Sequence, residues 1–379
     1  MTERILRNAR IVTADECFVG TVRIRDGLVS EVASGASTCL GAEDMEGDFL
    51  MPGLVELHTD NLEKHMLPRP GVHWDPYSAT VVHDAQCASA GITTVFDALT
   101  IGSRDQESVR ARMQETAIDS MERCRDDGVL RVDHLLHLRC EVAAADILSV
   151  FERHIDRADL KLISVMDHTA GQRQWRDLAK YRQYMERNGR YTDESFREML
   201  AAQREGHEEW AAGHRCTVVK AARARAIPLA SHDDTEIEHV VEASGEGITM
   251  SEFPTTVDAA AAARAAGMEI IMGAPNLVRG GSHSGNVSAE ELAERGLLDI
   301  LSSDYVPTSL MMSAFTLHHS LGWPLPRAVA AVSRTPARAV GLLDRGEISA
   351  GRRADLIRVR ACARQGVVMG TWVKGARVA

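Results

Sequence analysis

Hydrophobic and polar positions follow two patterns along the chain, and each predicts a different architecture. In residues 1–50, short apolar runs alternate with polar residues, and Asp26 and Gly27 between two of these runs are typical of a β-hairpin. Residues 345–379 repeat this alternation. We therefore expect the two ends of the chain to pair with each other and to form one small β-sandwich.

The central residues 51–344 contain apolar runs rich in β-branched residues, separated by helix-forming segments. Eight such runs occur, at residues 54–58, 93–97, 134–141, 162–168, 228–232, 249–252, 269–273 and 298–304. Alternating strands and helices indicate parallel βα units, and eight units predict an α/β fold of the (β/α)8 TIM-barrel type. Most runs end in Asp, Glu or His, at the barrel face where active sites lie.

One connection, residues 171–225, is too long for an ordinary turn between a strand and a helix. It is polar and helix-forming, with tyrosines among its basic residues. We expect a helical insertion over the barrel mouth. Its pattern fits a lid that grips an anion and an ordinary solvated helix pair equally well.

Composition narrows the function classes. The chain has 379 residues, 45% hydrophobic and 26% charged, with a net charge of −11, so it is globular, and nucleic acid and anionic membranes are not expected as general partners. Its seven cysteines are scattered without a Cys-x-x-Cys motif, which argues against a disulfide scaffold or a zinc ribbon. With no signal peptide or apolar run of membrane-spanning length, we expect a cytoplasmic protein. The sequence leaves open whether the protein forms a homo-oligomer.

Ligand-type residues gather at the predicted strand ends. His58 and Asp60 are two positions apart and would project to the same side of a strand. Four more such residues end other strands: Glu141, His168, His232 and Asp304. Burying six ionisable groups at one rim would cost several kcal/mol each unless cations compensate them. We therefore favour a metal site over a polar core without metal.

Six ligands suit two divalent ions. We expect His58, Asp60 and Asp304 to bind one ion, His168 and His232 to bind the other, and Glu141 to bridge them, because a bridge between two cations must be anionic. Two ions would acidify the water between them, and Asp304 would accept its proton. Nitrogen and oxygen ligands fit zinc, which we expect first, but also manganese or iron.

A second group of polar residues follows the seventh predicted strand, in residues 276–286. Backbone N–H groups at its two glycines, together with Arg279, Ser282, His283 and Asn286, fit an anion-binding loop, although a plain Gly-Gly turn is the alternative. Further cations follow other strand ends, at Lys64, Arg69, Arg139 and Arg173. Cations concentrated at the mouth of an acidic protein would attract a polyanionic substrate. Six other histidines have no such placement, and we interpret them as surface or packing residues: His65, His73, His83, His239, His318 and His319.

Residues 52–58 and 346–356 resemble the amidohydrolase superfamily. Longer blocks resemble one family within it, the α-D-ribose 1-methylphosphonate 5-triphosphate diphosphatases of the carbon–phosphorus lyase pathway. These blocks are residues 58–70, 137–141, 166–174, 231–234, 252–256, 272–286 and 302–305. Asp60 stands where the superfamily commonly has a second histidine, as in this diphosphatase family, and Glu141 stands for the carboxylated lysine that often bridges the metals.

The resemblance implies a metal-dependent hydrolase that cleaves a phosphorylated sugar between its α and β phosphorus atoms, giving the 5-phosphate and pyrophosphate. We expect an in-line displacement, with Arg279 and His283 neutralising the leaving pyrophosphate. Two alternatives remain. A cyclic-amide hydrolase or deaminase would use the same barrel, but a neutral ring needs no anion-binding loop. A non-catalytic scaffold would have lost the metals, which the complete ligand set disfavours.

Overall fold

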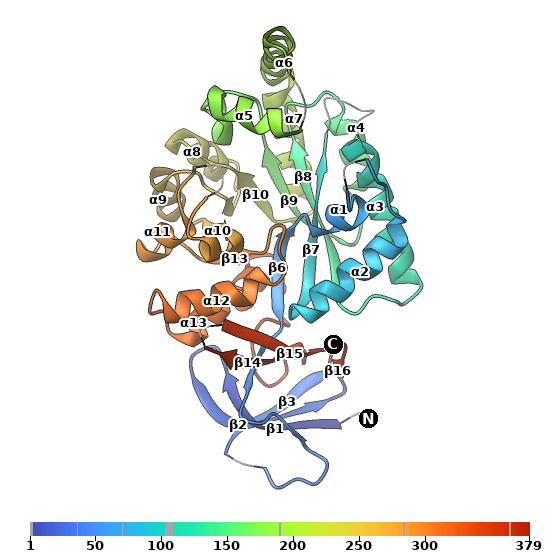
Figure 1. Cartoon of the computed structure of the whole chain (residues 1–379), viewed down its shortest axis with the longest axis vertical. Helices are drawn as coiled ribbons and strands as arrows, with labels where there is room; N and C mark the ends of the chain where they lie inside the picture. The colour runs from blue at the N-terminus through green and yellow to red at the C-terminus, as the bar shows by residue number, and fades with distance from the viewer. Residues whose placement is uncertain are drawn as a thin grey trace.

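The eight central runs form eight parallel strands of one barrel, as the sequence predicts, in the computed structural model of the chain (Figure 1). The structure describes residues 3–35, 37–69, 71–102, 109–188, 191–282, 285–363 and 365–379. The barrel strands are β6 (Leu54–Thr59), β7 (Ile92–Ile101), β8 (Asp133–Glu141), β9 (Leu160–Met166), β10 (Leu229–His232), β11 (Met250–Glu252), β12 (Glu269–Gly273) and β13 (Ile300–Ser302). Each pairs with the next in chain order, so their carboxyl ends lie at one rim.

The barrel closes at a narrow seam between its first and last strands. Thr59 and Asp304 form a parallel bridge there, and Asp60 N–H donates to the Asp304 carbonyl at 3.0 Å. Asp304 N–H in turn donates to the His58 carbonyl at 3.0 Å. The seam therefore holds together the backbone of three residues expected to bind one metal.

The barrel strands are buried on both faces, which is why they read as continuous apolar runs rather than as alternating ones. All six residues of β6 are buried. Inside the barrel, Val55, Phe96 and Leu162 pack with Ile271 and Ile300. The outer face of the barrel packs against the surrounding helices in a larger cluster.

Helices cover the barrel between its strands. They are α1 (Asn61–Met66), α2 (Pro76–Ser89), α3 (Val109–Asp126), α4 (Ile147–His154), α8 (Ile237–Gly245), α9 (Val257–Ala265), α10 (Ala274–Arg279), α11 (Ala289–Glu294), α12 (Ser309–His319), α13 (Leu325–Ala330) and α14 (Arg334–Ala339). Across the ranges described above, no helix combines the length and apolar character needed to cross a membrane.

The long connection after β9 is helical, as expected. It contains a 3₁₀ turn η1 (Arg173–Trp175), α5 (Leu178–Asn188), α6 (Asp193–Gly206), a π-helical turn η2 (His207–Ala211) and α7 (Ala212–Ala224). Figure 1 shows α5, α6 and α7 in green at the end of the barrel opposite the chain termini. Tyr181 and Phe196 are buried in a small apolar cluster with Ala170, which fixes α5 against α6.

The two chain ends pair in one mixed sheet, as the sequence predicts. Its strands are β1 (Glu3–Val12), β2 (Cys17–Arg25), β3 (Leu28–Ser34), β4 (Glu43–Asp44), β5 (Phe49–Pro52), β14 (Leu356–Cys362), β15 (Gln365–Val373) and β16 (Ala376–Arg377). The C-terminal β14 joins β5 in antiparallel register, and a bridge between Leu28 and Arg353 links the two ends again. Figure 1 shows this sheet beneath the barrel, away from the green helices.

Candidate metal centre

The first candidate group lies at the barrel seam. His58 is the last but one residue of β6, and Asp60 and Asp304 follow the two strands that meet there. One ligand atom from each residue lies within 4.8 Å of the others, and His58 Nε2 is 3.6 Å from Asp60 Oδ1. The structure thus brings together the three residues that we expected to share one ion.

The second group adds a residue that the sequence analysis did not select. His168 Nε2 and His232 Nε2 each lie 3.6 Å from Asp233 Oδ2, and the ligand atoms of all three lie within 4.8 Å of one another. Asp233 has a positive φ of 56°, and its N–H donates to the Glu252 carbonyl at 2.9 Å. Its position directly after a strand-ending histidine was the available signal.

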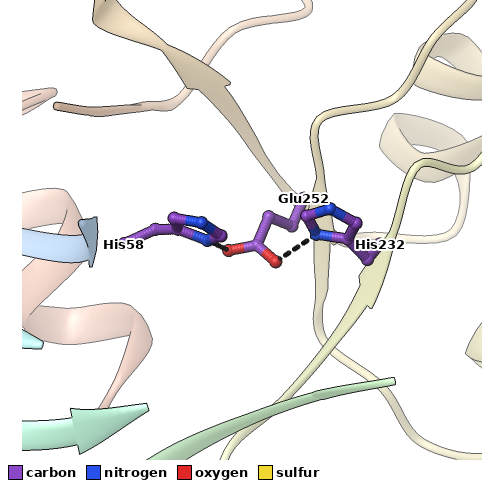
Figure 2. Close-up of side chains that lie close together, drawn as sticks. All are labelled: His58, His232 and Glu252. Carbon is purple, nitrogen blue, oxygen red and sulfur yellow. Dashed lines mark hydrogen bonds and ion pairs between the residues drawn. The ribbon is translucent and has the colours of Figure 1, made fainter. Parts of the chain in front are cut away.

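Glu252 orients two of the imidazoles from behind (Figure 2). Its carboxylate is fully buried at the end of β11, 2.7 Å from His58 Nδ1 and 2.6 Å from His232 Nδ1. When both Nδ1 atoms donate to this carboxylate, the Nε2 atoms carry the lone pairs that a metal ion needs. The sequence analysis counted Glu252 as a strand end but gave it no role.

Glu141 does the same for His168. Its Oε2 is 2.8 Å from His168 Nδ1, and its Oε1 accepts from the His168 backbone N–H at 3.1 Å. Both oxygens are therefore directed at His168, and Glu141 belongs to none of the ligand groups found among the described residues. The structure arranges Glu141 to orient a ligand, whereas we had expected it to bridge two ions.

Glu56 fixes the floor of the site. It is fully buried on β6, where it accepts from the His58 backbone N–H at 2.6 Å and from the Ser302 hydroxyl at 2.8 Å. Burial raises the pKa of Glu56 to about 7, although these hydrogen bonds work in the opposite direction. Glu56 ties the first barrel strand to the last and sets the backbone position of His58.

The carboxylates make the site strongly negative. Burial lowers the pKa of His58, but the Glu252 and Asp60 carboxylates together outweigh it and raise that pKa to about 10. In the same way, burial lowers the pKa of His168, but Glu141 and Asp233 together overcome it and raise that pKa to about 9. Burial works to raise the pKa of Glu252, yet the neighbouring imidazoles hold it well below its usual range. A field that retains protons so strongly also attracts a divalent cation.

One buried atom tests whether the residues fit a metal ion. Asp233 Oδ2 is buried and has no hydrogen-bond partner among the described residues, since the two imidazole nitrogens at 3.6 Å are too distant. An unpaired buried carboxylate oxygen is costly unless a cation compensates it. Two imidazole nitrogens and one carboxylate oxygen are a common ligand set for zinc and related ions. The donor set therefore fits.

Both groups open into one cavity of about 380 Å³. The metal ligands expected from the sequence that line it are His58, Asp60, His168, His232 and Asp304. Trp175, Tyr181 and Met185 of the helical insertion also line the cavity, so this insertion forms part of its wall. Glu141 and Glu252 lie outside the lining, as their orienting positions require.

The residues expected to bind substrate divide into two sets. Arg139, Arg279, Ser282 and Asn286 line the cavity. Arg139 also donates to Asp60 Oδ1 at 3.1 Å and so holds a candidate metal ligand in place. The loop that carries Ser282 and Asn286 is anchored by Asn276, whose side chain donates to the Val287 carbonyl and accepts from the Ala289 N–H.

The other expected cations do not line the cavity. Arg173 is buried, and its guanidinium donates to Asp234 Oδ1 at 2.7 Å and to the His232 carbonyl at 3.0 Å. It therefore positions the β10 end instead of facing the cavity. Lys64 donates to the Tyr305 carbonyl and lies 4.9 Å from that ring. Arg69 is exposed, and His283 lies outside the described residues.

A third group of histidines and carboxylates lies away from the cavity, between α2 and the strands β7 and β8. We call it the sealed cluster: His83, Asp84, Asp97 and His134. Asp97 lies 2.8 Å from His83 Nε2 and 2.7 Å from His134 Nδ1. All four side chains are buried, and none lines the cavity. His83 is thus a packing residue, as the sequence predicts.

Comparison with known proteins gives the family. Residues 187–378 match the profile of the Amidohydrolase family. The chain is 43% identical over 376 residues to "Alpha-D-ribose 1-methylphosphonate 5-triphosphate diphosphatase" of Escherichia coli (strain K12), covering 99% of this chain and 100% of that protein.

Solved structures at lower identity share the fold. A 5-methylcytosine deaminase from Klebsiella pneumoniae is 15% identical with a TM-score of 0.65, covering 99% of this chain and 98% of that one. N-acetylglucosamine-6-phosphate deacetylase from Pasteurella multocida is 12% identical with a TM-score of 0.63, covering 99% of both chains. On the family profile and the full-length relative, the chain belongs to the amidohydrolase family.

Proposed function

We propose that this hydrolase cleaves α-D-ribose 1-methylphosphonate 5-triphosphate between its α and β phosphorus atoms, releasing the 5-phosphate and pyrophosphate. The observation that carries the proposal is the 43% identity over 99% of the chain to an Escherichia coli protein named for this activity. The deaminase and deacetylase structures are too distant in sequence to argue for their own substrates. We also propose a cytoplasmic location, which is supported by seven unpaired cysteines.

The proposed centre holds two divalent ions, zinc first and manganese or iron as alternatives. The family generally uses divalent metals. In our proposal His58, Asp60 and Asp304 hold one ion, and His168, His232 and Asp233 hold the other. Asp233 takes the place in the ligand set that we had expected for Glu141. When bound, the ions polarise a phosphoryl oxygen and lower the pKa of a water molecule.

Within this centre, Asp304 is the proposed general base. Its carboxylate lines the cavity, and its backbone is fixed at the barrel seam by hydrogen bonds to residues on β6 and just after it. Asp304 has a φ of 52°, a left-handed conformation that is uncommon outside glycine and frequent at functional sites. Arg139 meanwhile holds Asp60 in place, which leaves Asp304 to accept the proton of the attacking water.

The leaving pyrophosphate is proposed to bind at the loop after α10. Arg279, Ser282 and Asn286 line the cavity there, and Arg279 is exposed with no ion pair to a described carboxylate. A guanidinium without a carboxylate partner is available to bind phosphate in bidentate geometry. This feature favours a polyanionic substrate over the neutral ring of a cyclic amide.

Phosphorus NMR of the zinc-loaded enzyme with the ribosyl triphosphate tests the proposal. Pyrophosphate and the 5-phosphate should appear together in equal amounts. Release of orthophosphate would contradict cleavage between the α and β phosphorus atoms. A parallel panel of dihydropyrimidine and hydantoin rings should remain intact, and rapid ring opening would favour the cyclic-amide alternative instead.

A further inference from the structure

The helical insertion reaches across the cavity mouth to the loop after α10. Lys180 lies on α5, and its Nζ is only 2.9 Å from the point that a Cβ on Gly285 would occupy. Gly285 has a φ of 77°, so a side chain there would be strained as well as crowded. The glycine thus gives the ammonium group room beside the loop that carries Ser282 and Asn286.

Among the residues that the structure describes, no carboxylate neutralises the charge of Lys180. The residue is exposed, and its ammonium group makes no ion pair or hydrogen bond with the residues that the structure describes. Arg182, two positions further along α5, is different, because it lies 2.8 Å from Glu186 and 2.6 Å from Asp193. Arg182 is therefore satisfied by carboxylates, whereas Lys180 lies against the proposed phosphate-binding loop.

Side-chain contacts hold α5 in place, and they therefore also set the position of Lys180. Its neighbour Tyr181 is buried, lines the cavity and accepts a hydrogen bond from the Gln203 side chain at 2.8 Å. Tyr181 also packs on Phe196 of α6, with ring centroids 6.2 Å apart. Lys180 does not itself line the cavity, but it projects from an anchored helix whose Tyr181 and Met185 line it together with the candidate metal ligands.

We propose that Lys180 binds the terminal phosphate of the substrate, jointly with Arg279 at the start of the same loop. The proposal rests on the proposed triphosphate cleavage and extends it. A substrate whose α phosphate lies at the metal ligands would extend its β and γ phosphates toward Arg279 and the loop after α10, beside which Lys180 lies. Lys180 would make the enzyme selective for a triphosphate over a diphosphate, and the insertion would act as the anion-gripping lid.

Steady-state kinetics of Lys180→Gln with the 5-triphosphate and the matching 5-diphosphate tests this role. The KM for the triphosphate should rise about tenfold, the loss expected for one charge-assisted contact, with kcat unchanged and the KM for the diphosphate unchanged. Lys180→Arg should restore most of the affinity. Arg182→Gln is the matched control on α5 and should leave the triphosphate-to-diphosphate ratio as in the wild type.

An unchanged ratio in Lys180→Gln would overturn the inference while leaving the proposed cleavage intact. If the wild-type enzyme cleaves no triphosphate at all, the proposed function fails, and binding still tests the lysine. Calorimetry with pyrophosphate should then show about tenfold weaker binding to zinc-loaded Lys180→Gln than to Arg182→Gln. Equal affinities in the two variants would overturn the role of Lys180 as an anion-binding residue.

Discussion

Two of the histidine and carboxylate clusters among the described residues of this barrel differ in how their ring nitrogens are used. We call the first the mouth cluster: His58, Asp60, His168, His232, Asp233 and Asp304. The sealed cluster lies behind α2. In the sealed cluster, His83 bonds Asp97 through Nε2 at 2.8 Å and Asn61 through Nδ1 at 3.0 Å, so both of its nitrogens have protein partners. His134 Nδ1 lies 2.7 Å from Asp97, and its Nε2 makes no hydrogen bond with the described residues but lies 3.4 Å from Asp84 Oδ1, away from the cavity.

In the mouth cluster the same ring atoms are divided between two tasks. Nδ1 of each histidine is held from behind by Glu252 or Glu141 at 2.6–2.8 Å, and Nε2 lies 3.6 Å from the nearest carboxylate of the cluster. Only this cluster borders the cavity. Residue type alone therefore does not define a metal site. What defines it is a nitrogen directed at open space with a carboxylate fixing the other nitrogen.

The charges of the two clusters differ as well. In the sealed cluster, burial lowers the pKa of His134, but Asp97 raises it to about 9. Arg131 lies 2.9 Å from Asp84, so two cations offset two carboxylates. The mouth cluster has three carboxylates of its own, with Glu141 and Glu252 behind them, and these five outnumber Arg139 and the two histidines with raised pKa values, His58 and His168. The charges of the sealed cluster balance without an ion, whereas the mouth cluster needs further positive charge.

The largest expected effect is the loss of a mouth ligand. His232→Ala should lower kcat on the order of a thousandfold or more, because it removes one metal ligand of the second group. Elemental analysis should show fewer ions per chain. His134→Gln, from the sealed cluster, is the control and should retain the full metal content. Near-normal turnover by His232→Ala would contradict the assignment.

Replacing the proposed base Asp304, which also lowers the negative charge of this metal ligand, should cause a smaller loss of kcat. Asp304→Asn should lower kcat by about 100- to 1,000-fold, the usual range for a general base, measured at saturating substrate and zinc. Substrate affinity should change little. If Asp304→Asn retains nearly full activity with both ions bound, the base must be a different group.

A substitution in the sealed cluster should lower the stability of the fold and leave catalysis unchanged. Asp97→Asn should lower the free energy of unfolding by about 3–5 kcal/mol, because it removes one partner from a buried ion pair with His134. Urea unfolding measures this loss. Metal content and kcat per folded molecule should match the wild type, and a selective loss of metal would mean that the two clusters are not independent.

Removing the charge of a carboxylate that orients a histidine should weaken metal binding to an intermediate degree. Glu141→Gln keeps the shape of the side chain but removes the charge behind His168, and we expect metal affinity to fall about 10- to 100-fold. Competition with a chelator gives the affinity. A complete loss of one ion at saturating zinc would show instead that Glu141 is itself a ligand, as the sequence first indicated.

The smallest expected effect is a pH dependence of the stability that the sealed cluster contributes. His134 has a pKa raised to about 9 by Asp97, so its ion pairs stabilise the fold fully below about pH 6.5 and lose this contribution as the pH rises through 9. The stability difference between wild type and Asp97→Asn should therefore shrink between pH 6.5 and 9.5 in urea unfolding. A constant difference would mean that His134 is neutral throughout.

The fold could be read from the sequence because each barrel strand is a buried apolar run bounded by polar residues. The eight expected runs overlap β6 to β13, and their ends shift by a few residues: 162–168 became Leu160–Met166, and 298–304 became Ile300–Ser302. His168 and Asp304 accordingly stand just past their strands. Pairing of the two chain ends was predictable from their shared strand pattern.

Only part of the site could be predicted from the sequence, for a physical reason. Spacing shows which residues reach the rim, but not which atom of each side chain faces the cavity. Alternation along β10 would direct Asp233 away from His232, yet a φ of 56° at Asp233 breaks the alternation. Glu141 and Arg173 reach the correct region, and there each contacts another protein group instead of the cavity.

Anomalous diffraction from crystals grown with zinc and collected at the zinc edge tests the central claim most directly. We predict two peaks at the mouth cluster, one beside His58, Asp60 and Asp304 and one beside His168, His232 and Asp233. No peak should lie beside His83, Asp97 and His134. A peak at the sealed cluster with none at the mouth would contradict this account.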